Sequence, residues 1–282
     1  MDNNVGKELA ALDEQLARRH GAYASYATEF DPILEGTFGD GPADGIDRLL
    51  DVYCGPQSCV LDLGCGAGFT LCRLAPKVRA IWGFEQVDYF LEAARLRVRA
   101  QGLTNVTLVL GNVAEENDVT QLPENAFGFG FSRRGPNLVP WLLPKLKEDA
   151  IWVQEFAQFP IGLNEILGRT AKTFLPRSSG NPDWAVDIYQ HLGMLPVSVK
   201  TFYYEQYFRD VDHLAAYLDT GWFLIERPYE AGRDREALEL YARYNATPKG
   251  IRMIGQRKVG VYRRAQADYL PADNPCKEGM MR

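Results

Sequence analysis

The chain has 282 residues, of which 46% are hydrophobic, and it carries a formal net charge of −6 at pH 7. This length and apolar content suffice for one large α/β domain with appended helices. The acidic balance argues against a general nucleic-acid-binding protein, which usually has a strong basic surplus. No apolar stretch reaches membrane-spanning length and residues 1–4 lack the features of a signal peptide, so we expect a cytoplasmic protein with no membrane partner.

The first part of the chain, residues 1–55, is predicted to form a helical extension. Leu9, Leu12 and Leu16 share one face of a predicted amphipathic helix over residues 7–19. An aromatic helical turn over residues 22–30 either packs against its neighbours or closes over a ligand. The remainder is predicted as a turn-rich loop over residues 36–45 and a short helix over residues 46–53.

The most informative stretch follows, at Cys59 to Gly68. An apolar run over residues 59–63 predicts a buried strand, and it breaks into a turn at Gly64, Gly66 and Gly68 before a helical pattern resumes. Such a strand–turn–helix lets a ligand approach bare backbone at the carboxyl end of a strand. A dinucleotide fingerprint would need glycine where Phe69 stands, so the loop favours a nucleoside-like ligand without a pyrophosphate.

Helix and strand patterns then alternate. Further strands are predicted over residues 80–85, 106–110, 127–132 and 150–156, with a broken helix over residues 137–146 that contains two prolines. Alternation of this kind predicts a mostly parallel sheet covered by helices on both faces. The helix over residues 86–101 buries Phe90, Ala93, Ala94 and Val98, and its arginines 95, 97 and 99 are interpreted as a solvated face.

These motifs, in this order, resemble class I S-adenosylmethionine-dependent methyltransferases over roughly residues 45–160. The resemblance rests on Leu61-Asp62-Leu63-Gly64-Cys65-Gly66-Ala67-Gly68, on the acid Glu85 at the end of the next strand, and on the Gly111-Asn112 turn. It implies a doubly wound, seven-stranded, mostly parallel Rossmann-like sheet and S-adenosyl-L-methionine as the cofactor. Residues 56–160 would be the cofactor-binding core, and residues 161–282 the rest of the sheet with a helical substrate cap.

The resemblance also assigns roles to individual residues. In the family, the acid at Glu85 accepts hydrogen bonds from both ribose hydroxyls, and the residue at Asn112 contacts adenine. Relatives usually carry Asp at Asn112, but an amide oxygen can still accept from the adenine amino group. Cys65 is expected to lie against the cofactor, so that its alkylation blocks binding. The implied cofactor-binding set is Asp62, Gly64, Cys65, Gly66, Gly68, Glu85, Gln86, Asn112, Val113 and Ser132.

The downstream region is where the acceptor should be recognised. Helices are predicted over residues 161–174, 183–189, 210–218 and 234–245, and strands over residues 197–208 and 258–263. The two helices between these last strands are expected to cap the active-site face. The aromatic residues between positions 202 and 223 are candidates to line an apolar pocket, with core packing accounting for most of them.

Two adjacent arginines follow the fourth strand, at the position that faces the transferable methyl group in this fold. Arg133 and Arg134 are predicted to bind an anionic acceptor or the carboxylate of the cofactor, because a guanidinium can hold a carboxylate or phosphate in two hydrogen bonds. The alternative is that they form ion pairs with Glu155, Asp149 or other acids at the sheet edge.

No catalytic residue stands out, and methyl transfer needs little beyond alignment of the reacting groups and exclusion of water. A general base is required only if the nucleophile carries a proton at neutral pH. His20 and Glu155 are the candidates for that role, ahead of His191 and His213. The five cysteines form no metal-binding spacing and no metal is expected.

Three functions remain open. The favoured one is methyl transfer to a small-molecule acceptor, which is anionic if the two arginines bind it. The second is modification of RNA or protein, with one contiguous basic patch formed by Arg252, Arg257, Lys258, Arg263 and Arg264 beside the two arginines above. The third is a protein that binds S-adenosylmethionine without transferring its methyl group.

Overall fold

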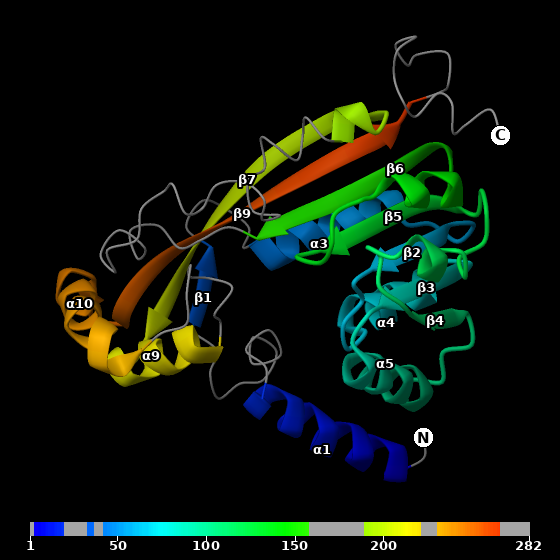
Figure 1. Ribbon diagram of the computed structural model, residues 1–282. Coiled ribbons are helices and arrows are strands. Elements are labelled where there is room, and N and C mark those ends of the chain that lie inside the picture. The colour runs from blue at the N-terminus through cyan, green and yellow to red at the C-terminus, as the bar shows by residue number, and fades with distance from the viewer. Residues whose placement is uncertain (1–2, 20–32, 37–41, 158–188, 221–229, 266–282) are drawn as a thin grey trace.

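The computed structural model describes residues 3–19, 33–36, 42–157, 189–220 and 230–265. Within these ranges one sheet of nine strands runs through the molecule in the order β1-β7-β9-β6-β5-β2-β3-β4, with β8 paired to β9 (Figure 1). None of the helices in these ranges has the length and apolarity needed to cross a bilayer. The predicted helix over residues 161–174 and most of that over residues 183–189 lie outside the described residues.

Five parallel strands form the centre of the sheet. They are β2 (Cys59–Leu63), β3 (Ala80–Glu85), β4 (Val106–Leu110), β5 (Phe127–Arg133) and β6 (Leu146–Ala157). The intervening helical segments are α4 (Phe69–Leu74), a 3₁₀ turn η1 (Ala75–Lys77), α5 (Asp88–Ala100), α6 (Glu116–Val119) and a 3₁₀ helix η2 (Pro140–Lys145). The carboxyl ends of the parallel strands therefore meet at one edge, called the carboxyl edge below.

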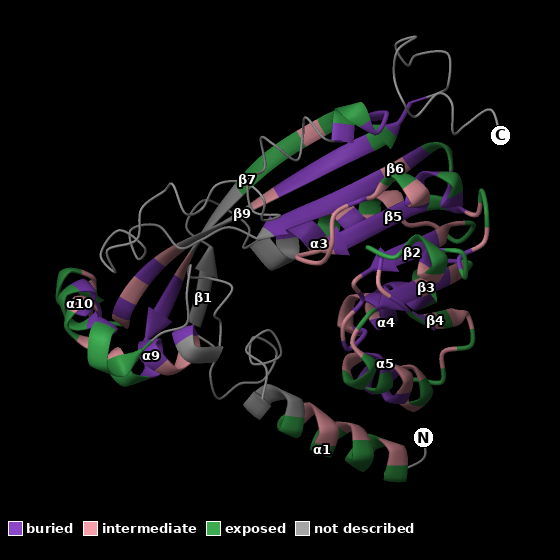
Figure 2. Ribbon diagram, viewed as in Figure 1, coloured by how far each residue is buried: buried purple, intermediate pink, exposed green. Residues whose placement is uncertain are grey.

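Both faces of β2 are buried, which explains its mostly apolar sequence. In β2, Leu61 and Leu63 join a core cluster with Trp152 on one face, whereas Val60 joins Phe131 on the other. Figure 2 shows these buried residues concentrated on the central strands. The alternation follows from the two-residue period of a strand.

The predicted doubly wound sheet is confirmed, with two differences in extent. β7 (Met194–Phe208) and β9 (Gly250–Arg264) complete the seven strands, and β9 is antiparallel to both β6 and β7. Both strands are longer than predicted, and the short strands β1 (Ile33–Gly36) and β8 (Ala246–Thr247) add to them. The predicted loop over residues 36–45 is wrong at its end, because helix α3 (Pro42–Tyr53) already begins at Pro42.

The extra length of β7 and β9 builds an extension beyond the core. β6 ends at Ala157, which pairs with Arg257, so residues 250–256 of β9 continue past the carboxyl edge with β7 and β8 as partners. Helices α9 (Val211–Thr220) and α10 (Ala231–Tyr244) pack there around Phe208, Leu218 and Met253. We call β1, β8, α9, α10 and these ends of β7 and β9 the distal extension (Figure 1).

Helix α1 (Asn3–Arg19) lies against α5, close to the turn that follows β2. Its Leu12 packs on a small cluster that contains Ala67 of the glycine turn and Ala93 of α5. The N-terminal segment therefore reaches the same part of the core as the predicted cofactor loop.

Candidate functional site

The turn after β2 has the open backbone that its glycines predict. Gly64, Gly66 and Gly68 have φ angles of 76°, 53° and 79°, in the left-handed region that favours glycine. The amides of Gly64 and Cys65 both donate to the carbonyl of Phe84, at 2.8 and 3.2 Å, which fixes the turn against β3. A Cβ placed on Gly66 would have no described atom within 4 Å, so this glycine borders open space.

Glu85 ends β3 directly beside this turn. Its side chain is buried, and its two oxygens accept hydrogen bonds of 2.9 Å from the backbone amides of Gly66 and Val87. The acid is thereby held at the glycine turn, as the resemblance requires of a ribose-binding carboxylate. Gln86, the next predicted cofactor residue, is exposed.

Asp62 and Ser132 end neighbouring strands beneath the turn. Both are buried, and the Oδ2 atom of Asp62 and the Oγ atom of Ser132 have no hydrogen-bond partner among the described residues. Burial raises the pKa of Asp62 to about 8; Arg133 opposes the shift and Glu85 adds to it. Buried polar atoms without hydrogen-bond partners are costly, so these two atoms fit a site whose ligand supplies the partners.

The third strand ends in the turn predicted to contact adenine. Asn112 and Val113 lie there, but the Oδ1 atom of Asn112 accepts from the amide of Ala114 at 3.0 Å. The amide of Asn112 in turn donates to Asp118 at 2.8 Å, and the indole nitrogen of Trp141 donates to the carbonyl of Val113 at 2.7 Å. One lone pair of Oδ1 therefore holds the turn, and the other is what an adenine amino group could use.

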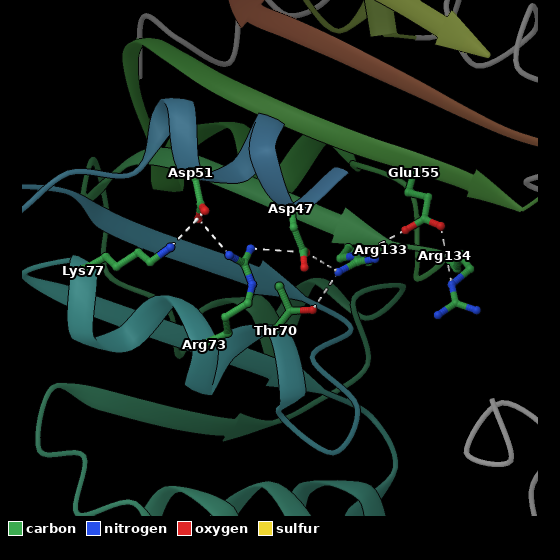
Figure 3. Close-up of polar contacts among 8 residues, drawn as sticks. All are labelled: Asp47, Asp51, Thr70, Arg73, Lys77, Arg133, Arg134 and Glu155. Atoms are coloured by element: carbon green, nitrogen blue, oxygen red, sulfur yellow. Dashed lines mark hydrogen bonds and ion pairs between the residues drawn. The ribbon is translucent and has the colours of Figure 1, made fainter. Parts of the chain in front are cut away.

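Arg133 lies in a network of ion pairs that joins several elements at the carboxyl edge (Figure 3). Its Nε donates to Glu155 at 3.1 Å, and one of its terminal nitrogens contacts Asp47 of α3 at 2.9 Å and Thr70 of α4 at 3.2 Å. Glu155 also forms an ion pair with Arg134, at 3.6 Å. The structure thus provides the ion pairs with Glu155 that were the alternative interpretation of the two arginines.

The network continues along α3. Asp47 also contacts Arg73 at 3.2 Å, and Asp51 contacts both Arg73 and Lys77, at 2.8 and 2.9 Å. Figure 3 shows these side chains forming a line between α3 and the segment from α4 to η1. We conclude that this network fixes α3 and α4 relative to the ends of β5 and β6. Binding of an acceptor by Arg133 and Arg134 stays a prediction.

The described catalytic candidates, Glu155, His191 and His213, lie in different segments of the structure. Glu155 is 3% exposed, and each of its two carboxylate oxygens is paired with one of the two arginines. His213 is buried on α9, where its Nδ1 accepts from the amide of Arg209, and His191 is exposed. His20 lies outside the described residues. No proton acceptor is thereby singled out.

The sulfur of Cys65 is buried beside β3, where a Cβ on Gly83 would lie 2.8 Å from it, and contact of Cys65 with the cofactor stays a prediction. One expectation about a side chain in this region is wrong. Arg97 is not on a solvated face: it is 8% exposed, donates from Nε to the carbonyl of Ala67 at 3.0 Å, and binds Asp13 of α1. A helical pattern alone cannot reveal a buried arginine whose acid comes from a distant helix.

The residues at the carboxyl edge fit S-adenosylmethionine. Glu85 would hold the ribose hydroxyls, the turn at Asn112 would hold adenine, and the glycine turn with Asp62 would hold the methionine part. The open space at Gly66 and the Oδ2 atom of Asp62, which has no partner among the described residues, support this fit. The bound cofactor would supply an electrophilic methyl group on a sulfonium.

Comparisons with known proteins agree with this geometry. Residues 60–141 match the family model described as "Methyltransferase domain". A curated 23S rRNA (uracil(1939)-C(5))-methyltransferase of Pectobacterium carotovorum is 41% identical over 80 residues, which are 28% of this chain. The chain spans only 17% of the length of that relative.

Two solved structures share the fold over most of the chain. A functionally unknown protein of Deinococcus radiodurans R1 aligns with a TM-score of 0.61 at 20% identity, over 89% of this chain and 98% of that one. A putative methyltransferase of Bacillus halodurans C-125 aligns with a TM-score of 0.57 at 13% identity, over 79% of this chain and 100% of that one. Residues 60–141 therefore contain a methyltransferase domain, and the sheet around them has the fold of the class I S-adenosylmethionine-dependent methyltransferases.

Proposed function

We propose that the protein transfers a methyl group from S-adenosylmethionine to a small-molecule acceptor. The observation that carries the proposal is Glu85, held at the glycine turn by Gly66 and Val87, within the matched domain. An acid fixed at that point recognises the paired hydroxyls of a ribose. Alignment of the acceptor with the methyl group would supply most of the rate enhancement.

The acceptor is proposed to lie between the carboxyl edge and the distal extension. The distal extension projects past that edge because β9 continues beyond the last residue of β6. It can therefore cover an acceptor bound at the edge. Phe208 and Tyr241 of the distal extension are buried in its core cluster, so these two residues serve the core of the extension rather than a pocket. Helix α1 of the N-terminal segment is proposed to act as a lid, because its Leu12 reaches the glycine turn.

Modification of RNA is the second candidate, and it is favoured by the name of the rRNA-modifying relative. The five basic residues of β9 that were predicted to form one RNA-binding patch are spread along the strand. Arg252 and Arg264 lie at opposite ends of β9, about 40 Å apart at the usual rise of a strand. Arg252 is paired with Glu205, and Arg264 is buried and donates to the carbonyl of Leu146. The small-molecule acceptor is therefore preferred.

A transfer assay with methyl-labelled S-adenosylmethionine tests the proposal. The full chain is incubated with fractions of small metabolites, RNA and protein, beside Glu85→Ala and the control Glu92→Ala, whose side chain is exposed on α5. Label in a small molecule, lost with Glu85→Ala and kept with Glu92→Ala, supports the proposal. Label in RNA or protein favours the second candidate. Cofactor binding without any transfer would make the chain a non-catalytic binding protein.

A further inference from the structure

Arg97 makes contacts that neither the motif nor the family match explains. It lies in the last turns of α5 and is buried, although its neighbour Arg99 is exposed. Its Nε donates to the carbonyl of Ala67 at 3.0 Å, and its guanidinium carbon lies 3.7 Å from the centre of the Phe69 ring. The side chain of Arg97 thus contacts one residue within the glycine turn, Ala67, and the first residue of the helix that follows it, Phe69.

The same guanidinium reaches helix α1. One terminal nitrogen of Arg97 contacts both carboxylate oxygens of Asp13, at 2.8 and 2.9 Å, across 84 positions of sequence. Beside this ion pair, Leu12 packs with Ala67, Phe69, Phe90 and Ala93. An apolar contact and an ion pair therefore dock the same turn of α1 onto the glycine turn.

The location of the hydrogen bond within the turn matters. Ala67 lies between Gly66 and Gly68, and the amide of Gly66 is held by Glu85. Arg97 therefore fixes the Ala67–Gly68 peptide, which is separated by one peptide unit from the Cys65–Gly66 peptide that Glu85 fixes. The φ angles of the two glycines alone would leave the turn adaptable. A turn that is fixed at these two points before the ligand binds should bind it more tightly, because less conformational entropy is lost on binding.

We propose that Arg97 is a positioning residue of the cofactor turn, and that its ion pair with Asp13 makes cofactor affinity depend on the docking of helix α1. The inference rests on the proposed function, since it concerns the same turn. A buried guanidinium needs its carboxylate: without Asp13 it is left as an uncompensated buried charge and pulls away from Ala67 toward water. Undocking of α1 would therefore loosen the turn, and a bound cofactor would favour docking by the same factor.

The test compares variants of the intact chain. Asp13→Asn keeps the shape of the side chain and removes its charge, Arg97→Met removes the guanidinium, and Asp13→Glu restores a carboxylate. Arg99→Met is the control, because Arg99 is an exposed arginine on the same helix. Binding of S-adenosylhomocysteine is measured by calorimetry, the kinetics are measured with varied S-adenosylmethionine, and hydrogen exchange follows α1.

Asp13→Asn and Arg97→Met are each expected to raise the Kd about tenfold, the usual size of a lost charge-assisted hydrogen bond. The double variant should bind no more weakly than Arg97→Met alone, and Asp13→Glu should recover part of the affinity. The cofactor KM should rise while kcat at saturating cofactor stays unchanged, and amide exchange in α1 should accelerate. If the two residues had only a structural role, the variants would be less stable but would not show a raised cofactor KM with an unchanged kcat.

Three results separate the possible failures. Unchanged affinity in Asp13→Asn and Arg97→Met, with normal binding by the wild-type chain, overturns the inference alone. Effects that multiply in the double variant overturn the coupling through the ion pair. Absence of binding by the wild-type chain contradicts the proposed function, and the inference falls with it.

Discussion

The carboxylate of Glu85 accepts the backbone amide of Gly66 at 2.9 Å, which ties the end of β3 to the middle of the glycine turn. The second oxygen of Glu85 accepts from Val87 at the same distance. Both oxygens are therefore oriented by main-chain donors and keep further lone pairs for a ligand. This relationship makes the turn and the acid one unit, and the predictions below concern that unit and its support.

Alanine at two glycines of the turn should separate ligand binding from folding. Gly66→Ala adds a methyl group where the structure has open space, so it should cost only about 1 kcal/mol of backbone strain. The methyl group would occupy the space that faces the ligand, and the affinity for S-adenosylhomocysteine should fall about tenfold or more. Gly68→Ala places its Cβ 3.0 Å from that of Ala94 and should cost about 1–3 kcal/mol of stability. Urea unfolding and calorimetry on both variants check this, and normal binding by Gly66→Ala would contradict the placement of the ligand.

Loss of Arg133 should destabilise the fold more than loss of Arg134. Arg133 has partners on α3, α4 and β6, and Glu155 beside it is 3% exposed. Arg133→Met should therefore lower the free energy of unfolding by about 3 kcal/mol, because it removes one partner of a buried ion pair. Arg134→Met, which removes the longer contact to Glu155, should cost less than half as much. Urea unfolding of both variants measures these changes. Equal losses in the free energy of unfolding would show that the network does not depend on Arg133.

The buried carboxyl of Asp62 should make stability depend on pH. Its pKa is raised to about 8, so between pH 4 and 8 the folded state holds a proton that the unfolded state has released. The contribution of the raised pKa of Asp62 to the free energy of unfolding is thus complete below pH 4 and is lost as the pH rises toward 8. Asp62→Asn mimics the protonated form, and its stability relative to the wild type should improve by up to about 1.4 kcal/mol per pH unit from pH 5 to 8. Asp88→Asn, at an exposed site, is the control. If the free energies of unfolding of Asp62→Asn and the wild type changed in parallel with pH, the raised pKa of Asp62 would be refuted.

Cys65 should resist alkylation in the folded protein. Its sulfur packs against Gly83, and burial raises the pKa of its thiol well above the usual value, so little reactive thiolate forms. Pulsed maleimide labelling with mass spectrometry should modify the half-buried Cys54 and Cys59 before Cys65. Rapid labelling of Cys65 in the native state would show that the thiol faces the ligand after all.

Much of the core could be predicted because its signals are local. β2 and β3 begin and end at the predicted residues, since apolar runs that stop at glycines or at an acid mark buried strands clearly. The glycine turn and Glu85 were likewise readable from spacing. In contrast, β7 and β9 pair with each other far beyond the core, and nothing in either sequence alone says where such pairing stops.

The charged side chains were the least predictable part. The helical pattern of α5 predicts that Arg97 faces solvent. Its ion pair with Asp13 forms only because α1 docks against α5. Arg133 was identified by its position, but its partner Asp47 comes from a helix 86 positions earlier. Ion pairs between distant segments depend on the folded arrangement, which periodicity and spacing do not encode.

The central claim is that the turn at Gly64 to Gly68 and Glu85 form an S-adenosylmethionine site. Calorimetric titration of the intact chain with S-adenosylhomocysteine, beside Glu85→Ala and the surface control Glu92→Ala, tests it most directly. We predict one site per chain, an affinity that falls at least about tenfold in Glu85→Ala through the loss of charge-assisted hydrogen bonds, and no change in Glu92→Ala. No binding by the wild-type chain, or equal binding by a folded Glu85→Ala, would contradict the claim.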